Sequence, residues 1–161
     1  ILAVKKLNPD TTMETLIPDF DGRKELIDML IKAGPEVISH NLETVRRLTP
    51  QVRSKAKYDL SLKVIKQISD SGLVSKSGIM LGLGESEEEI YQTMDDLLAN
   101  ECKVLTLGQY LQPSRKHLAV EAYIHPDTFE KYKHAGLKKG FRHVESSPLV
   151  RSSYHAEKHV K

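Results

Sequence analysis

Polar residues capable of binding or catalysis follow several apolar runs of strand length in this sequence. They stand at positions 18–21, 40–44, 82–85, 109–115 and 151–155. Ligands of parallel α/β proteins sit at the carboxyl ends of the strands, so polar groups at these points indicate a binding site there. The sequence therefore predicts one polar rim made by several strand ends.

The segment His-Asn-Leu-Glu-Thr at 40–44 places Asn41 and Glu43 two residues apart, which on a strand end gives them the same face. An amide and a carboxylate suit ribose hydroxyls or an amino group, whereas a turn with an Asx hydrogen bond is the structural alternative. Gly82, in Gly-Leu-Gly-Glu, permits close backbone approach. The segment lacks the Lys-Ser/Thr of a phosphate loop, so it is either a ligand seat or a tight turn.

Lys76 and Ser77 lie at the start of the same apolar run. The lysine could pair with a carboxylate, but a solvated side chain is the more common outcome. The final segment is denser, because Arg151, Ser152 and Ser153 are followed at once by Tyr154 and His155. The alternative is a solvated polar tail; against it, the apolar residues 148–150 predict that the segment starts inside the fold.

Composition excludes several classes of protein. The net charge of +2 arises from 24 basic and 22 acidic residues spread along the chain, unlike the concentrated basic face of a nucleic-acid binder. No apolar stretch approaches the roughly 18 to 20 residues of a membrane span. The single cysteine, Cys102, excludes an internal disulfide framework and indicates a reducing compartment. The seven histidines lack the spacing of a typical metal site.

Strand-like runs alternate with helical patterns along the whole chain, which predicts a parallel sheet with helices packed outside. Residues 1–10 resemble the end of a helix. Strands are expected within 11–20, 36–44, 76–85 and 103–114, helices at 23–34, 59–72, 86–101 and 125–140, and an extended segment at 143–156. Ser86 and Glu89 have the spacing of a capping box. A doubly wound sheet and part of a (β/α) barrel fit equally well, in one domain over 1–161.

With these motifs in hand, the sequence resembles the lipoyl synthase family over essentially its whole length. The resemblance rests on 15–22, 39–45, 76–85, 105–118, the Tyr-Ile-His-Pro-Asp-Thr-Phe helix start and 140–157. It implies an α/β fold, the carboxyl-terminal portion of a radical S-adenosylmethionine barrel of the partial (β/α)6 type with its first strands absent, and a tail segment at 148–157.

The resemblance also implies an activity, cofactors and partners. The family uses S-adenosyl-L-methionine and two [4Fe–4S] clusters to insert two sulfur atoms at C6 and C8 of a protein-bound octanoyl chain. The expected partners are octanoylated lipoyl carrier domains (the E2 subunits of 2-oxoacid dehydrogenases and the glycine cleavage H protein) and an electron donor, but neither nucleic acid nor a membrane. A bacterial protein of this kind is cytoplasmic; a eukaryotic one is in the mitochondrial matrix.

Site residues are carried over position by position. Ser153 matches the serine ligand of the auxiliary cluster, with Ser152 as the alternative register, and Arg151 is expected to hold this loop or to counter the cluster's charge. The wider pattern GxIxGxxE matches at 78, 82 and 85, with methionine in place of isoleucine at 80. The residues expected to contact the cofactor are Asn41, Glu43, Lys76, Ser77, Gly82, Glu85 and Gln109, with Tyr110 and Gln112 on the substrate side.

One departure from the family limits the expected activity. The family's cluster-binding cysteine motifs, expected upstream of Ile1, are absent, and Cys102 matches neither of them, so it is expected to be a small core residue. A lone thiolate cannot hold an iron–sulfur cluster, so the isolated chain is predicted to be inactive. Rival interpretations are a non-catalytic α/β binding module and a biotin-synthase-like enzyme. The basic residues between 138 and 161 could dock an acidic carrier domain or form a solvated surface.

Overall fold

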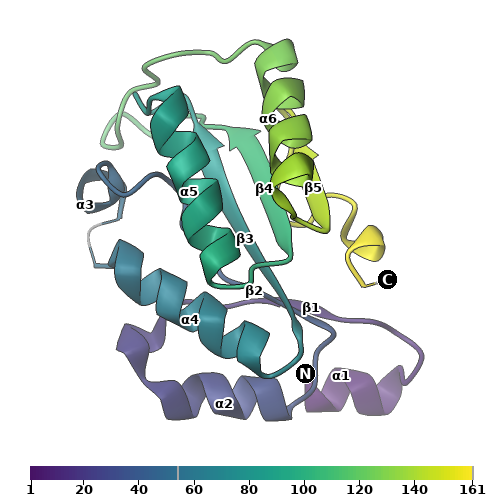
Figure 1. Cartoon of the computed structure of the whole chain (residues 1–161). Helices are drawn as coiled ribbons and strands as arrows, with labels where there is room; N and C mark the ends of the chain where they lie inside the picture. Colours follow the sequence, from purple (N-terminus) through teal and green to yellow (C-terminus); the bar gives the residue numbers. More distant parts are fainter. Residues whose placement is uncertain (54, 161) are drawn as a thin grey trace.

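The computed structural model describes residues 1–53 and 55–160, and the helices alternate with strands along them (Figure 1). The strands are β1 (Glu14–Leu16), β2 (Val37–Ser39), β3 (Val74–Leu81), β4 (Val104–Gln109) and β5 (His143–Ser146). The α-helices are α1 (Leu2–Leu7), α2 (Lys24–Lys32), α3 (Thr49–Val52), α4 (Tyr58–Asp70), α5 (Glu87–Ala99) and α6 (Pro126–Lys139). Two short 3₁₀ helices, η1 (Phe20–Gly22) and η2 (Ala156–Lys158), complete the elements.

The five strands of the described residues form one parallel sheet in the order β1-β2-β3-β4-β5. A doubly wound sheet reverses its strand order at a switch point, whereas a barrel adds each strand beside the one before it. The order therefore decides between the two predicted arrangements in favour of a barrel segment. β1 and β5 are both edges, so the segment is open.

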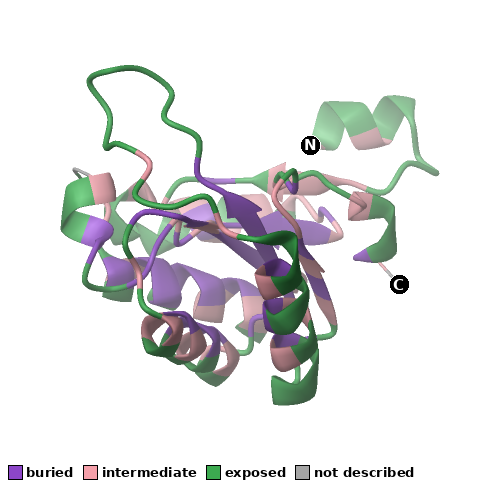
Figure 2. Ribbon diagram, turned by 90° about the horizontal axis from the view of Figure 1, so that it is seen from above, coloured by how far each residue is buried: buried purple, intermediate pink, exposed green. Residues whose placement is uncertain are grey.

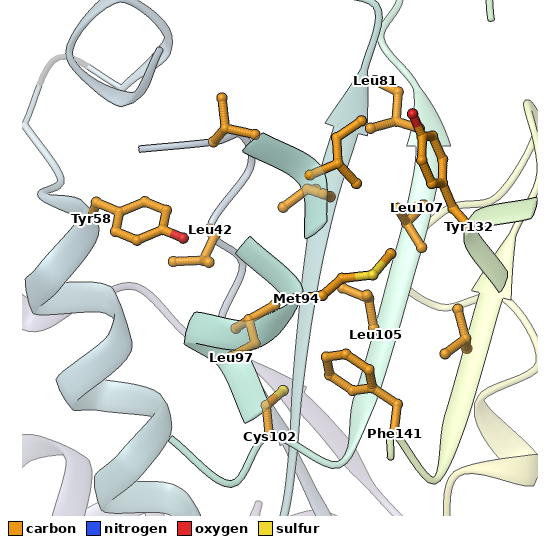
Figure 3. Close-up of a cluster of buried hydrophobic side chains, with 14 of the residues drawn as sticks. Leu42, Tyr58, Leu81, Met94, Leu97, Cys102, Leu105, Leu107, Tyr132 and Phe141 are labelled. Atoms are coloured by element: carbon orange, nitrogen blue, oxygen red, sulfur yellow. The ribbon is translucent and has the colours of Figure 1, made fainter. Parts of the chain in front are cut away.

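One face of the sheet is covered by α2, α4, α5 and α6, which lie on the same side of it in both views (Figures 1 and 2). Strand alternation sends Ile79 and Leu81 of β3 toward these helices, along with Leu105 and Leu107 of β4. They pack in a buried apolar cluster with helix residues such as Met94 (Figure 3). We call this side the outer face and the opposite side the inner face.

Local signals set the helix ends that frame the outer face. The Ser86 hydroxyl accepts a hydrogen bond from the Glu89 amide at 3.3 Å, and the Glu89 carboxylate accepts one from the Ser86 amide at 2.8 Å. The predicted capping box at the start of α5 is thus confirmed. The short helix α3 was not predicted, because its four residues carry no helical periodicity.

The carboxyl-terminal segment differs from its prediction. Only His143–Ser146 is extended, and this stretch pairs in parallel with β4 as a fifth strand. Beyond it the chain turns repeatedly and ends in η2, so an extended conformation to residue 156 is wrong. Leu149 is 77% exposed, so the predicted burial of the apolar run holds for Val150, which is 4% exposed, but not for its neighbour.

Candidate functional site on the inner face of the sheet

A cavity of about 240 Å³ opens on the inner face, toward the carboxyl ends of the central strands. Residues from β3, β4, the loop after β2 and the terminal segment line it: Asn41, Glu43, Gly78, Ile79, Met80, Thr106, Gly108, Gln109, Leu111, Val150, Arg151 and Ser152. Segments more than a hundred residues apart in sequence thus meet around one space. Of the five segments predicted to form one polar rim, 40–44, 109–115 and 151–155 contribute to this cavity, whereas 18–21 and 82–85 do not line it.

Asn41 and Glu43 both line this cavity, although they lie in the loop after β2 and not on a strand end as predicted, because the strand stops at Ser39. Their loop is fixed by an isolated bridge to β3, in which the Glu43 amide donates to the Gly78 carbonyl at 2.9 Å and the Met80 amide donates to the Glu43 carbonyl at 2.8 Å. Glu43 has a φ of +67°, a conformation that disfavours ordinary side chains and often occurs at functional sites. The bridge holds the backbone of Glu43 in a fixed place beside the cavity.

The Asn41 side chain carries a hydrogen-bond acceptor that lacks a donor partner among the described residues. Its Oδ1 atom is buried and has no hydrogen-bond partner among the described residues. A buried polar atom without a partner costs free energy unless a ligand or water satisfies it. This atom therefore marks a place where a donor group of a polar ligand, such as an amino group or a hydroxyl, fits.

Glycines keep the floor of the cavity open. A Cβ atom at Gly78 would lie 2.5 Å from Thr106 Oγ1 and 3.2 Å from Asn41 Oδ1. One at Gly108 would lie 2.5 Å from the Val150 carbonyl oxygen, so the terminal segment can cross β4 only where that strand has no side chain. Thr106 and Gly108 were not among the predicted site residues, although their alternation with Leu105 and Leu107 is a signal for one shared face.

The terminal segment reaches the cavity through its first residues. Arg151 and the half-buried Ser152 line it, and the buried Val150 anchors the chain just before them. Ser153 is exposed and does not belong to the lining, although it directly follows Ser152. The structure thus brings Arg151 and the alternative serine to Asn41 and Glu43, and leaves Ser153 on the solvent side of them.

The side chains of Lys76 and Ser77 do not lie together, because consecutive residues of a strand point to opposite faces of the sheet. The Ser77 hydroxyl accepts a hydrogen bond from the Leu42 amide at 3.2 Å and, being buried, does not line the cavity. Lys76 lies on the inner face but is completely buried below the cavity, where it contacts Glu14, Ser152 and His159.

Three further predicted cofactor residues hold local structure. The Glu85 carboxylate accepts hydrogen bonds from the Gly82 amide at 2.6 Å and the Leu83 amide at 2.8 Å, which closes the turn after β3. Gly82 has a φ of +99°, and a Cβ there would lie 2.3 Å from the Ala122 carbonyl oxygen. Gln109 lines the cavity, yet its amide is committed to the base of the 110–125 loop: it donates to the Tyr110 and Ala122 carbonyls, both at 3.0 Å, and accepts from the Ile124 amide at 2.9 Å.

The residues present fit a polar organic cofactor better than they fit a cluster. Cys102 is 2% exposed and packs in the outer-face core, where burial raises the pKa of its thiol to about 12. The described residues include no group of three histidine, cysteine or acidic side chains arranged to hold a metal ion. The donor set of this segment therefore cannot hold an iron–sulfur cluster by itself. The prediction of Cys102 as a core residue is confirmed.

Of the helices built from residues 1–53 and 55–160, none is long and apolar enough to cross a membrane.

Comparison with known proteins agrees with this geometry. A family model described as the radical SAM superfamily matches residues 1–97. Over its full length the chain is 64% identical to a lipoyl synthase of Bacteroides fragilis, and it is 67% identical over 160 residues to one of Treponema denticola. It spans 56% and 55% of these relatives, respectively, so it corresponds to little more than half of each.

Solved structures show the same fold at low sequence identity. Streptococcus suis SuiB is similar with a TM-score of 0.68 and 15% identity, over 94% of this chain and 35% of that one. A domain of a pyruvate-formate lyase-activating enzyme from Bacteroides vulgatus gives a TM-score of 0.63 and 14% identity, over 89% of this chain and 88% of that one. Because the family model covers more than half of the sequence, the chain belongs to the radical SAM superfamily.

Proposed function

We propose that this chain is the carboxyl-terminal segment of a lipoyl synthase, an enzyme that inserts two sulfur atoms at C6 and C8 of an octanoyl chain carried on a lipoyl domain. The observation that carries the proposal is the meeting of the Arg151–Ser152 segment with Asn41 and Glu43 around one cavity at the carboxyl ends of parallel strands. High identity to lipoyl synthases over the whole sequence supports it.

S-adenosyl-L-methionine, together with two [4Fe–4S] clusters, would supply the hydrogen-abstracting radical and the sulfur for this reaction. Of these groups, the segment's own residues suit the nucleoside and amino-acid parts of S-adenosyl-L-methionine. The unpartnered Asn41 Oδ1 would accept from an amino or hydroxyl group, and the Glu43 carboxylate would take a second donor. Arg151 would counter negative charge at the same cavity.

Ser153 remains our proposed oxygen ligand of the auxiliary cluster, with Ser152 as the alternative. A hydroxyl oxygen is a harder and weaker ligand for iron than a thiolate, so this corner of a cluster would open most readily. Ser153 is exposed beside the cavity and Ser152 lines it, so both hydroxyls are within the terminal segment that crosses the inner face. The remaining ligands would have to be thiolates that this segment lacks.

The proposed partners follow from the proposed reaction. They are octanoylated carrier domains, of E2 subunits or of the glycine cleavage H protein, together with an electron donor. A cytoplasmic enzyme is the expectation for a bacterial source.

Single serine replacements in the longer enzyme that contains this segment would test the proposal. Replacing Ser153 with alanine should leave the cleavage of S-adenosyl-L-methionine measurable but lower lipoyl product about 10- to 100-fold, the usual loss when support of a metal site is removed. Ser152→Ala is the matched control, and the larger loss identifies the ligand. Product formation unchanged in both variants would refute the cluster role of this segment.

The segment alone provides a second test. After iron–sulfur reconstitution it should bind no cluster, as measured by iron and sulfide content, and it should transfer no sulfur to an octanoylated carrier. Turnover by the isolated chain would overturn the proposal that thiolates from elsewhere are required.

A further inference from the structure

Lys76 is the one lysine in the described residues that is completely buried, at 0% exposure. Burying a lysine is costly unless its charge is paired and its donors are satisfied. The side chain lies on the inner face beneath the cavity, so its surroundings must supply that compensation.

Partners from both ends of the chain surround the Lys76 ammonium. Its Nζ atom lies 2.8 Å from a carboxylate oxygen of Glu14 on the edge strand β1. It also donates to the Ser152 carbonyl and lies 3.2 Å from Nδ1 of His159. These partners are 62, 76 and 83 residues away in sequence.

The number of partners matches the chemistry of the group. A protonated lysine carries three N–H donors, and here three different residues offer an acceptor. Burial lowers the pKa of His159 to about 4, helped by the nearby positive charge of Lys76, so its neutral ring accepts at Nδ1. Lys76 thus pairs with a carboxylate, as the sequence allowed, but it is that of Glu14, and no donor of Lys76 remains for the contact to S-adenosyl-L-methionine that the family resemblance implied.

Two of the three contacts hold the terminal segment. The Ser152 carbonyl belongs to the stretch that lines the cavity, and His159 is completely buried seven residues later. Arg142 adds a hydrogen bond from its guanidinium to the His159 carbonyl. Between these two points the segment is held by short backbone turn hydrogen bonds and by a contact of 3.3 Å between the side chains of His155 and Glu157.

We propose that Lys76 is a positioning residue that fixes residues 151–159 across the inner face and thereby places Arg151 and Ser152 at the cavity. The contacts themselves are independent of the reaction, and only the consequence for catalysis rests on the proposed function. Lys76 acts through the segment and touches neither substrate nor cofactor.

Hydrogen exchange of the backbone amides measures this placement directly. The backbone amides at 154, 156, 158 and 159 donate to turn carbonyls within the segment. In Lys76→Met these amides should exchange at least about tenfold faster, because the charge-assisted hydrogen bonds that anchor the segment to Lys76 are lost. Lys63→Met, on an exposed position of α4, is the matched control and should leave these amides unchanged.

A double variant separates positioning from folding. Lys76→Met alone leaves Glu14 without its ion-pair partner and could unfold the chain, whereas Lys76→Met with Glu14→Met removes both charges, a change that proteins often tolerate. The double variant should keep the slow exchange of β3 and β4 but still show fast exchange in the terminal segment. Slow exchange of both regions in the double variant would overturn the proposal.

The kinetic test uses the longer enzyme. If Lys76 positions the segment, the double variant should lose lipoyl product by a larger factor than its KM for S-adenosyl-L-methionine rises, because displacing Arg151 weakens cofactor binding while Asn41 and Glu43 stay in place. A raised KM with unchanged exchange would instead assign Lys76 to the cofactor and overturn the inference. Failure of the proposed function would remove the activity readout in every variant, but it would leave the exchange result standing.

Discussion

The two faces of the sheet differ in polarity: the outer face is apolar and packed, and the inner face borders a polar cavity. On the outer face, Leu105 and Leu107 of β4 pack with helix residues in a continuous apolar core. On the inner face, Thr106 and Gly108 of the same strand border a polar cavity. Alternate positions of one strand thus contribute to stability and to the cavity. A substitution on the outer face should mainly lower the free energy of unfolding, and one on the inner face should mainly change ligand binding.

The largest effect is expected on the outer face. Leu107 is completely buried, so Leu107→Ala should lower the free energy of unfolding by about 2–5 kcal/mol, through lost burial and the cavity left behind. Chemical denaturation would measure it. Leu149→Ala, at a position 77% exposed, is the control and should change stability by less than about 0.5 kcal/mol. Equal losses would mean that the outer face is not the core.

Lowering the pH should reduce the free energy of unfolding through His159, which is buried next to Lys76. The pKa of His159 is lowered from 6.5 to about 4, because burial and the neighbouring Lys76 disfavour the charged ring. The unfolded chain therefore takes up the proton first as the pH falls, and up to ~3 kcal/mol of stability is lost between pH 6.5 and 4. Above pH 6.5 both states are neutral at this site, and it contributes no slope.

Denaturation at a series of pH values would show this loss, with His159→Asn as the comparison. The variant should have a shallower dependence between pH 6.5 and 4 than the parent chain. A residual slope is expected from His40, whose pKa is also lowered by burial. Identical slopes in the two proteins would contradict a neutral, buried His159.

A smaller effect on stability, but a specific one on binding, is expected at Gly78. The added methyl group of Gly78→Ala would press on Thr106 Oγ1 and narrow the cavity, at a cost of about 1–3 kcal/mol. Affinity for S-adenosyl-L-methionine in the longer enzyme should fall at least about tenfold, as measured by calorimetry. Combining it with Thr106→Ala should restore much of the stability; unchanged affinity in the single variant would remove this cavity as the cofactor site.

The smallest effect is expected at the carboxyl end of α6. Lys139 forms an ion pair with Asp95 at 2.6 Å on the surface, which contributes at most about 0.5 kcal/mol to the free energy of unfolding.

Lys138 and Lys139 precede β5 and so lie at the amino-terminal end of the strands, away from the cavity. Reversing both charges in the longer enzyme should therefore leave the carrier KM unchanged; a raised KM would revive the idea that these residues dock a carrier.

Periodicity and capping rules predicted the parts of the fold that depend on neighbours in sequence. The helix beginning at Ser86 follows from such a local pattern and occurs as expected. Asn41 and Glu43 both line the cavity, but they lie in the loop after β2, where Glu43 has a φ of +67°, so strand alternation does not explain their placement. Strand alternation also predicts that the side chains of Lys76 and Ser77 point to opposite faces, so both could not contact one cofactor. The burial of Lys76 was beyond such rules, because its compensating partners, Glu14 and His159, are distant in the chain.

The open edge at β1 has a consequence for the chain on its own. Leu16 in this strand is 57% exposed, and the strand has a neighbour on one side only. An edge strand with free backbone groups and an exposed leucine is a template for pairing with another molecule. We therefore expect self-association through intermolecular strand addition to limit the concentration at which this segment stays dispersed.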